Sequence, residues 1–176
     1  GDPELEAVRS LRGLHVECVL IESMDSDDWP DEHGPGTHLV LHMSPLGKIV
    51  PQLEELGVNL SSIVGYGYVQ LAGGEALPAL RRLQLTCIDS VNARFLTGVT
   101  AITQLCLDMC QQLPGLPDEI SQLSALQALS VEGCDSVASL AALQHSRQLS
   151  RVSLTACGLE ALNPQELHGL KALKVR

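Results

Sequence analysis

Aromatic residues are nearly absent from this sequence. They make up only 2% of the 176 residues, although hydrophobic residues as a class make up 45%. A core with so few large rings must be built from leucine, valine, isoleucine and alanine, and these side chains suit many small, similar layers better than one large globule. The length corresponds to a single domain with one core.

Long apolar runs and basic residues are also scarce. No apolar run approaches the roughly 20 residues of a membrane-spanning helix, and the N-terminus lacks the basic-then-apolar order of a signal peptide. The net charge is −10, and residues 1–60 hold most of it, with three basic against twelve acidic residues (3 − 12 = −9). Because lysine and arginine supply most of the affinity for phosphate backbones, we expect neither a nucleic acid nor a membrane as a partner.

The motifs of several common chemistries are missing as well. The six cysteines include no Cys-x-x-Cys pair, which is the spacing of zinc ribbons and fingers. There is no Gly-x-Ser-x-Gly elbow for a nucleophilic serine, and the glycines at 65–67 and 73–74 lack the Gly-Lys-Ser/Thr ending of a phosphate-binding loop. We therefore expect no enzymatic activity, no cofactor and no metal.

One segment does contain possible metal ligands. His33, His38 and His42 lie close to an acidic run, and imidazole and carboxylate groups together can bind cations. The run does not match a calcium-binding loop, because Pro30 stands at the sixth place, where the tight turn requires glycine. We interpret residues 23–37 as a solvated acidic loop.

What the sequence does contain is an internal repeat. Apolar residues recur as Leu-x-x-Leu-x-Leu-x-x-Cys, at the first, fourth, sixth and ninth places of each copy. Copies begin at Leu80, Ile102, Leu126 and Leu149, and we place an incomplete one at Leu173, which gives steps of 22, 24, 23 and 24 residues. The x-Leu-x-Leu-x segment alternates in polarity, which is typical of a strand with one buried face. The other residues of each copy return the chain, so that neighbouring strands form a parallel sheet.

The fullest copy, from residue 102 to 125, continues as Leu-x-x-Leu-Pro-x-x-Ile-x-x-Leu after its strand. These places are Leu113, Leu116, Pro117, Ile120 and Leu123, and the next copy echoes them with Leu159, Leu162, Pro164, Leu167 and Leu170. This pattern resembles the plant-type, cysteine-containing repeats of the leucine-rich-repeat family. The resemblance implies an α/β fold, a curved solenoid with a parallel sheet on the concave side and short helices or turns on the convex side.

The ninth place is a cysteine in three copies, at Cys110, Cys134 and Cys157. In the family this place is buried, and its polar atom bonds to the backbone of a neighbouring loop, which implies a structural role. Adjacent coils would bring such cysteines to disulfide distance, but packing alone explains their regular spacing. We favour free thiols, and with them a reducing compartment inside the cell, cytoplasmic or nuclear.

The repeat weakens toward the N-terminus. Looser copies are formed by Leu53, Leu56 and Val58 and by Leu11, Leu14 and Val16. The step of 42 residues from Leu11 to Leu53 is too long for one repeat, so this stretch contains either an insertion at about 23–37 or a decayed repeat with its strand near residues 39–43.

We therefore divide the chain into irregular repeats at residues 1–79 and regular repeats at 80–176. The last repeat ends inside a strand. Since a repeat without a neighbour exposes an apolar face, we expect further repeats or another subunit to cover the C-terminal end.

The polar places of the strands, the third, fifth and seventh, face the concave side. The candidate binding residues there are Arg82, Gln84, Thr86, Gln104, Asp108, Ser130, Glu132, Arg151, Ser153 and Thr155, with Cys106 and Ala128 at equivalent places. These small or mixed-charge side chains suit a broad contact rather than a pocket for a small ligand, although they lack the aromatic anchors of interface hot spots. We predict a protein–protein recognition module of a larger intracellular protein, adaptor or receptor-like. The alternative is a structural scaffold subunit of a large multiprotein assembly.

Overall fold

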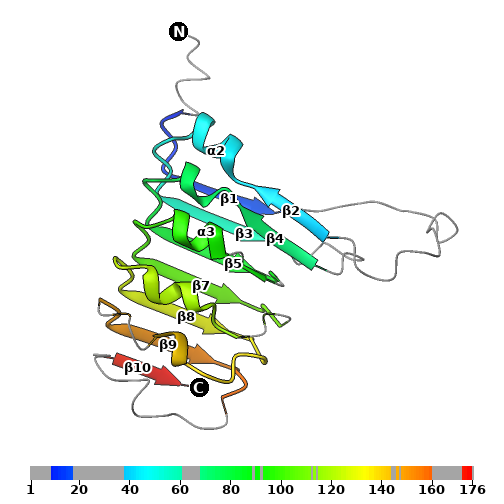
Figure 1. Ribbon diagram of the computed structural model, residues 1–176, viewed down its shortest axis with the longest axis vertical. Helices are drawn as coiled ribbons and strands as arrows, with labels where there is room; N and C mark the ends of the chain where they lie inside the picture. Colours follow the sequence, from blue (N-terminus) through cyan, green and yellow to red (C-terminus); the bar gives the residue numbers. More distant parts are fainter. Residues whose placement is uncertain are drawn as a thin grey trace, which may run out of the picture.

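A computed structural model of the chain describes residues 9–17, 38–60, 68–88, 90–91, 93–111, 113, 115–143, 146, 148–159 and 172–175. Within these residues the fold is α/β. Its main element is a seven-stranded sheet, and a second sheet has three strands (Figure 1).

All pairings in the larger sheet are parallel, and its strands lie side by side in chain order. They are β1 (Gly13–Glu17), β3 (Glu55–Asn59), β5 (Arg82–Thr86), β7 (Gln104–Asp108), β8 (Ala128–Glu132), β9 (Arg151–Thr155) and β10 (Ala172–Val175). The smaller sheet, also parallel, consists of β2 (His38–His42), β4 (Tyr68–Ala72) and β6 (Ser90–Val91).

Short helical segments lie in the returns between strands of the larger sheet. They are the α-helices α2 (Ser44–Ile49) and α3 (Ala93–Gly98) and the 3-10 helices η1 (Gly74–Ala76), η2 (Asp118–Gln122) and η3 (Ala141–Leu143). In Figure 1 they follow one another along one side of the molecule, with the strands of the larger sheet behind them.

The strand pairings align equivalent places of the repeat. Leu83, Leu105, Leu129 and Val152 occupy the fourth place and form one row on four neighbouring strands, as the sequence spacing predicts. The same row extends to the weaker N-terminal copies, since Leu56 on β3 pairs with Leu83 and Leu14 on β1 pairs with Leu56.

The register predicted for the last copy is wrong. We placed Leu173 at a first place, but it pairs with Val152 and so occupies a fourth place, three residues further into the repeat. The error has a simple cause. Leu170 and Leu173 are themselves spaced like a first and a fourth place, so a shift of three residues leaves the apolar pattern intact.

The extra length near the N-terminus adds no strand to the larger sheet, which excludes a decayed repeat whose strand belongs to that sheet. No strand separates β1 from β3 in the larger sheet, and Leu14 pairs directly with Leu56. The strand that we suspected near residues 39–43 exists as β2, but it belongs to the smaller sheet and pairs with β4. The acidic loop predicted at 23–37 lies outside the described residues, as does His33.

The core lies between the larger sheet and the return segments. Fourth-place and sixth-place side chains point into it, and Leu83 and Leu85 on β5 are 2% and 0% exposed. Leu96 of α3 and Ile120 of η2 close the core from the return side. Every fully buried side chain in the described part of the chain is hydrophobic. Burial of each such leucine or isoleucine stabilises the fold by roughly 1.5–3 kcal/mol.

A residue with a left-handed backbone conformation follows β5, β7, β8 and β9 in the larger sheet. Cys87, Met109, Gly133 and Ala156 stand at the eighth place of four successive copies and have φ angles of 57°, 53°, 62° and 49°. The backbone N–H groups of the first three donate to the strand that follows; that of Met109, for example, lies 2.8 Å from the carbonyl oxygen of Glu132. This turn directs the ninth residue from the sheet into the core.

The cysteines at the ninth place form hydrogen bonds to backbone, as the resemblance implied. The thiols of Cys110, Cys134 and Cys157 donate to backbone carbonyl oxygens of the preceding coil, with Sγ to oxygen distances of 3.7, 3.9 and 3.6 Å. Cys110 and Cys134 are buried, and Cys157 is half-buried. All five described cysteines are free thiols.

Candidate functional site

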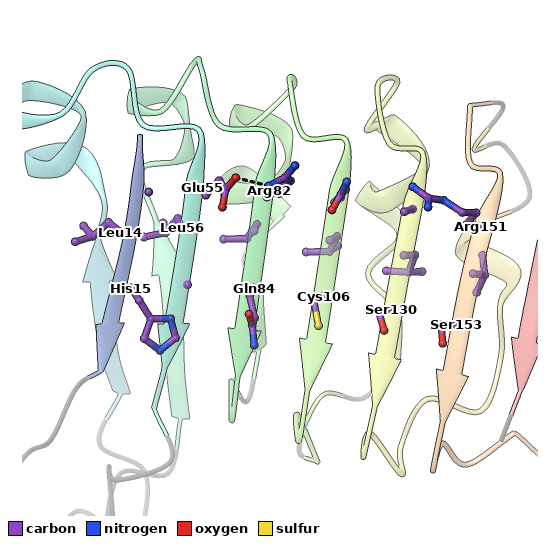
Figure 2. A pocket seen from close by; sticks show the side chains of 18 residues that line it. Leu14, His15, Glu55, Leu56, Arg82, Gln84, Cys106, Ser130, Arg151 and Ser153 are labelled. Carbon is purple, nitrogen blue, oxygen red and sulfur yellow. Dashed lines mark hydrogen bonds and ion pairs between the residues drawn. The ribbon is translucent and has the colours of Figure 1, made fainter. Parts of the chain in front are cut away.

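The face of the larger sheet opposite the core is hollowed into an open groove. We call this side, which carries the third-, fifth- and seventh-place side chains, the open face. The groove has a volume of about 910 Å³ and crosses six strands, from β1 to β9 (Figure 2). Its lining comes from the third, fourth and fifth places of each strand. The third- and fifth-place side chains are on this face, because side chains alternate between the two faces of a strand.

The strand pairings sort these side chains into three rows that run across the sheet. The third-place row is Gly13, Glu55, Arg82, Gln104, Ala128 and Arg151, and the fifth-place row is His15, Gly57, Gln84, Cys106, Ser130 and Ser153. The seventh-place row includes Asn59, Thr86, Asp108, Glu132 and Thr155. Successive rows are about 6.6 Å apart along the strands.

The structure brings six of the ten predicted binding residues together. Arg82, Gln84, Gln104, Ser130, Arg151 and Ser153 line the groove. The other four, Thr86, Asp108, Glu132 and Thr155, follow at the carboxyl ends of the same strands and do not line it.

We expected a broad contact surface and no pocket for a small ligand on this face, and the structure has an open groove there. Small residues such as Gly57, Ser130 and Ser153 line the groove together with longer ones such as Arg82 and Gln104. The result is a long, open groove rather than an enclosed cavity, which still suits an extended contact.

Two groove residues on the N-terminal strands were missing from the prediction. His15 on β1 and Glu55 on β3 line the groove. The signal was present in the sequence, because these residues hold the fifth and third places of the looser copies that begin at Leu11 and Leu53. The His15 ring lies over Gly57, where a Cβ atom would overlap it.

Charges are distributed unevenly over the open face. Arg82 forms an ion pair with Glu55 on the neighbouring strand (Figure 2). Arg151 has no carboxylate within ion-pair distance among the described residues. At the other end of the strands, Asp108 and Glu132 lie directly opposite each other on β7 and β8.

Cys106 is the only thiol that lines the groove within the described residues, and its environment disfavours nucleophilic chemistry. Partial burial raises its pKa above the ordinary value, and the carboxylates of Asp108 and Glu132 raise it further, against a weaker opposing effect of a hydrogen bond with Ser130. A thiol with a raised pKa is mostly protonated at neutral pH, and the thiolate is the reactive form.

No cluster of three or more histidine, cysteine or acidic side chains suited to a metal ion occurs among the described residues. In the same part of the chain, the helices are all too short or too polar to cross a membrane.

No protein-family model matches the chain, and no curated protein is significantly similar to it in sequence.

Proposed function

We propose that the chain is a segment of a leucine-rich-repeat solenoid and that its open face binds another protein. Three recurring features support the solenoid: strands in the same register every 22–27 residues, a left-handed residue at the eighth place and a cysteine ladder at the ninth. Each repeated unit packs on the one before it, which is the organisation that repeat proteins share.

The observation that carries the binding proposal is the groove that crosses six strands of the open face. Polar side chains project into it from successive strands, and the groove does not close into a small-molecule cavity. An extended surface of this kind suits a macromolecular partner, which contacts many side chains at once. Burial and nearby carboxylates raise the pKa of the Cys106 thiol, so we assign that thiol no nucleophilic role.

Cross-linking mass spectrometry on the native protein in its complexes tests this function. Reagents that couple carboxylates are suitable, because Glu55, Asp108 and Glu132 lie on the open face, whereas Glu75 and Asp118 lie on return segments. We expect cross-links to a partner from the first three residues and few from the other two. Cross-links confined to the return segments would contradict the proposal.

The same experiment separates recognition from the alternative role as a structural scaffold in a large assembly. A scaffold subunit contacts neighbours on several sides, so its return segments and its open face would cross-link equally. A substitution pair adds a functional readout. Arg151→Glu in the groove should reduce co-purification of the partner, whereas Lys48→Glu on α2 makes the same charge change on a return segment and should leave it unchanged.

A further inference from the structure

Among the described residues, no ion pair neutralises the two charged ends of the groove region over β7, β8 and β9. Arg151 is exposed at the third place, and among the described residues no acidic side chain pairs with it. Asp108 and Glu132 hold paired seventh places on adjacent strands, roughly 4.8 Å apart across the sheet. Like charges placed directly opposite each other destabilise a sheet, so a cation bound between them would relieve a repulsion.

The floor between these charges is small and uncharged. The third place of β8 is Ala128, and the fifth places of β8 and β9 are Ser130 and Ser153. Figure 2 shows that the Arg151 side chain extends toward β8, above these short residues. A ligand can therefore rest on the floor and reach both charged ends without meeting a tall side chain.

The N-terminal half of the groove lacks this polarity. Arg82 is already paired with Glu55, so its charge is satisfied from within the protein. The seventh places there are Glu17, Asn59 and Thr86, so the one acidic residue, on the edge strand β1, has no like charge opposite it. Among the described residues, an unpaired third-place arginine together with two facing seventh-place carboxylates thus occurs only over β7, β8 and β9.

The spacing of the charges indicates the shape of the ligand. The third and seventh places are four residues apart along a strand, which is about 13 Å, and β9 lies one and two strand spacings, about 5 and 10 Å, from β8 and β7. The Arg151 side chain extends toward β8 and so reduces this lateral offset (Figure 2). In an extended polypeptide, residues four positions apart lie on the same face and have this same separation. In an α-helix, 13 Å corresponds to about nine residues, and side chains nine positions apart point to opposite sides. An extended segment therefore presents both side chains on one face at about this spacing with only three residues between them.

We propose that the groove over β7, β8 and β9 binds an extended polypeptide segment with one acidic and one basic residue four positions apart. The acidic side chain pairs with Arg151, and the basic side chain lies between Asp108 and Glu132. Uncharged residues between them lie over Ser130 and Ser153. This inference rests on the proposed function and specifies the chemistry of the partner.

The test uses two defined peptides and the full 176-residue chain. Both are capped peptides of serine and threonine that contain one aspartate and one lysine. In the first peptide these two residues are four positions apart, and in the second they are adjacent. Titration is followed by amide chemical shifts in two-dimensional NMR spectra, which detect weak binding and locate it.

We expect the first peptide to shift the amides of Ser130 and Ser153 and to bind about fivefold more tightly than the second, because only the first engages both charged ends. Arg151→Ala and Glu132→Gln should each weaken its binding by about two- to fivefold. The matched controls Lys48→Ala and Glu75→Gln make the same charge changes on return segments and should have no effect. Raising the salt from about 0.15 M to 1 M should weaken binding, because the screening length falls from about 8 Å to 3 Å.

Equal affinity for the two peptides would overturn the inference, as would shifts located away from β8 and β9 or the absence of binding up to the solubility limit. The spectra of the variants show whether each one is folded, so that a loss of binding is not mistaken for unfolding. If the native protein cross-links to a partner through its open face but the first peptide fails to bind, the chemistry of the occupant is wrong and the proposed function stands. Cross-links confined to the return segments would contradict both the proposed function and this inference.

Discussion

The Cys134 thiol donates a hydrogen bond to the backbone carbonyl of Leu107, a residue of the preceding coil. The Sγ to oxygen distance is 3.9 Å, and a second carbonyl, that of Glu132, lies 3.3 Å from the sulfur. Cys110 and Cys157 make equivalent contacts. In these three copies one side chain thus connects the end of a strand to the copy before it, where the backbone leaves the regular pattern of the sheet.

Replacement of Cys134 by alanine should therefore destabilise the fold by about 1–2 kcal/mol, through loss of the thiol contacts and a small cavity at a fully buried site. Cys106→Ala is the matched control, because its thiol lies on the open face and is only half-buried. We expect the control to change stability by less than about 0.5 kcal/mol. Urea unfolding followed by circular dichroism measures both, and equal losses would contradict a structural role for the ladder.

The left-handed eighth place leads to a stabilising substitution. Ala156 has a φ of 49°, a conformation that costs a residue with a Cβ atom about 1 kcal/mol relative to glycine. Gly133 holds the equivalent place one coil earlier. Ala156→Gly should therefore stabilise the fold by up to about 1 kcal/mol.

The control for this substitution is Ala141→Gly, at an exposed residue of η3 whose φ is not positive. There the glycine should destabilise the fold by about 0.5–1 kcal/mol, because it adds only flexibility to the unfolded chain. Thermal unfolding of the two variants compares them directly. If both lower the melting temperature, the eighth place carries no strain.

The regular part of the fold could be predicted because its signals are local. Leu105, Leu129 and Val152 recur at nearly constant spacing. Each lies within a segment of alternating polar and apolar residues, which is typical of a strand with one buried face. The same alternation predicted which side chains point away from the core, onto the open face. Six of the ten residues chosen on that basis line the groove.

The sequence was less informative where a pattern was ambiguous or depended on distant segments. The Leu-x-x-Leu spacing around Leu173 permitted two registers, and only strand pairing distinguishes them. The smaller sheet was not predicted as a unit, because β6 contains only two residues and none of its strands carries the repeat. The Glu55–Arg82 ion pair depends on β3 and β5 being neighbours although β4 lies between them in the chain.

Close packing between return segments gives a third prediction. Gly74 in η1 lies against the backbone of α3, and a Cβ atom there would overlap the carbonyl of Phe95. Because backbone cannot move aside as a flexible side chain can, Gly74→Ala should destabilise the fold by about 2 kcal/mol or more. Gly13→Ala on β1 is the control, since the nearest atom to its new Cβ, that of Glu55, is 3.8 Å away. Urea denaturation should show a large loss for the first variant and none for the second.

The last prediction concerns the reactivity of Cys106. Partial burial raises its pKa, and so do the carboxylates of Asp108 and Glu132. Since only the thiolate reacts with iodoacetamide, Cys106 in the folded protein should be alkylated more slowly near pH 8 than in the urea-unfolded chain, and its rate should continue to rise as the pH passes 9.

Neutralising the carboxylates isolates the electrostatic part of this effect. Asp108→Asn and Glu132→Gln each remove a negative charge that opposes ionisation, so each should lower the pKa of Cys106 and increase its alkylation rate at a fixed pH. Asp118→Asn on η2 is the control, because it makes the same chemical change on a return segment. Mass spectrometry of the peptide that contains Cys106 gives the rates. An unchanged rate in both variants would mean that the two carboxylates do not act on the thiol, and that their negative field does not extend over the groove floor.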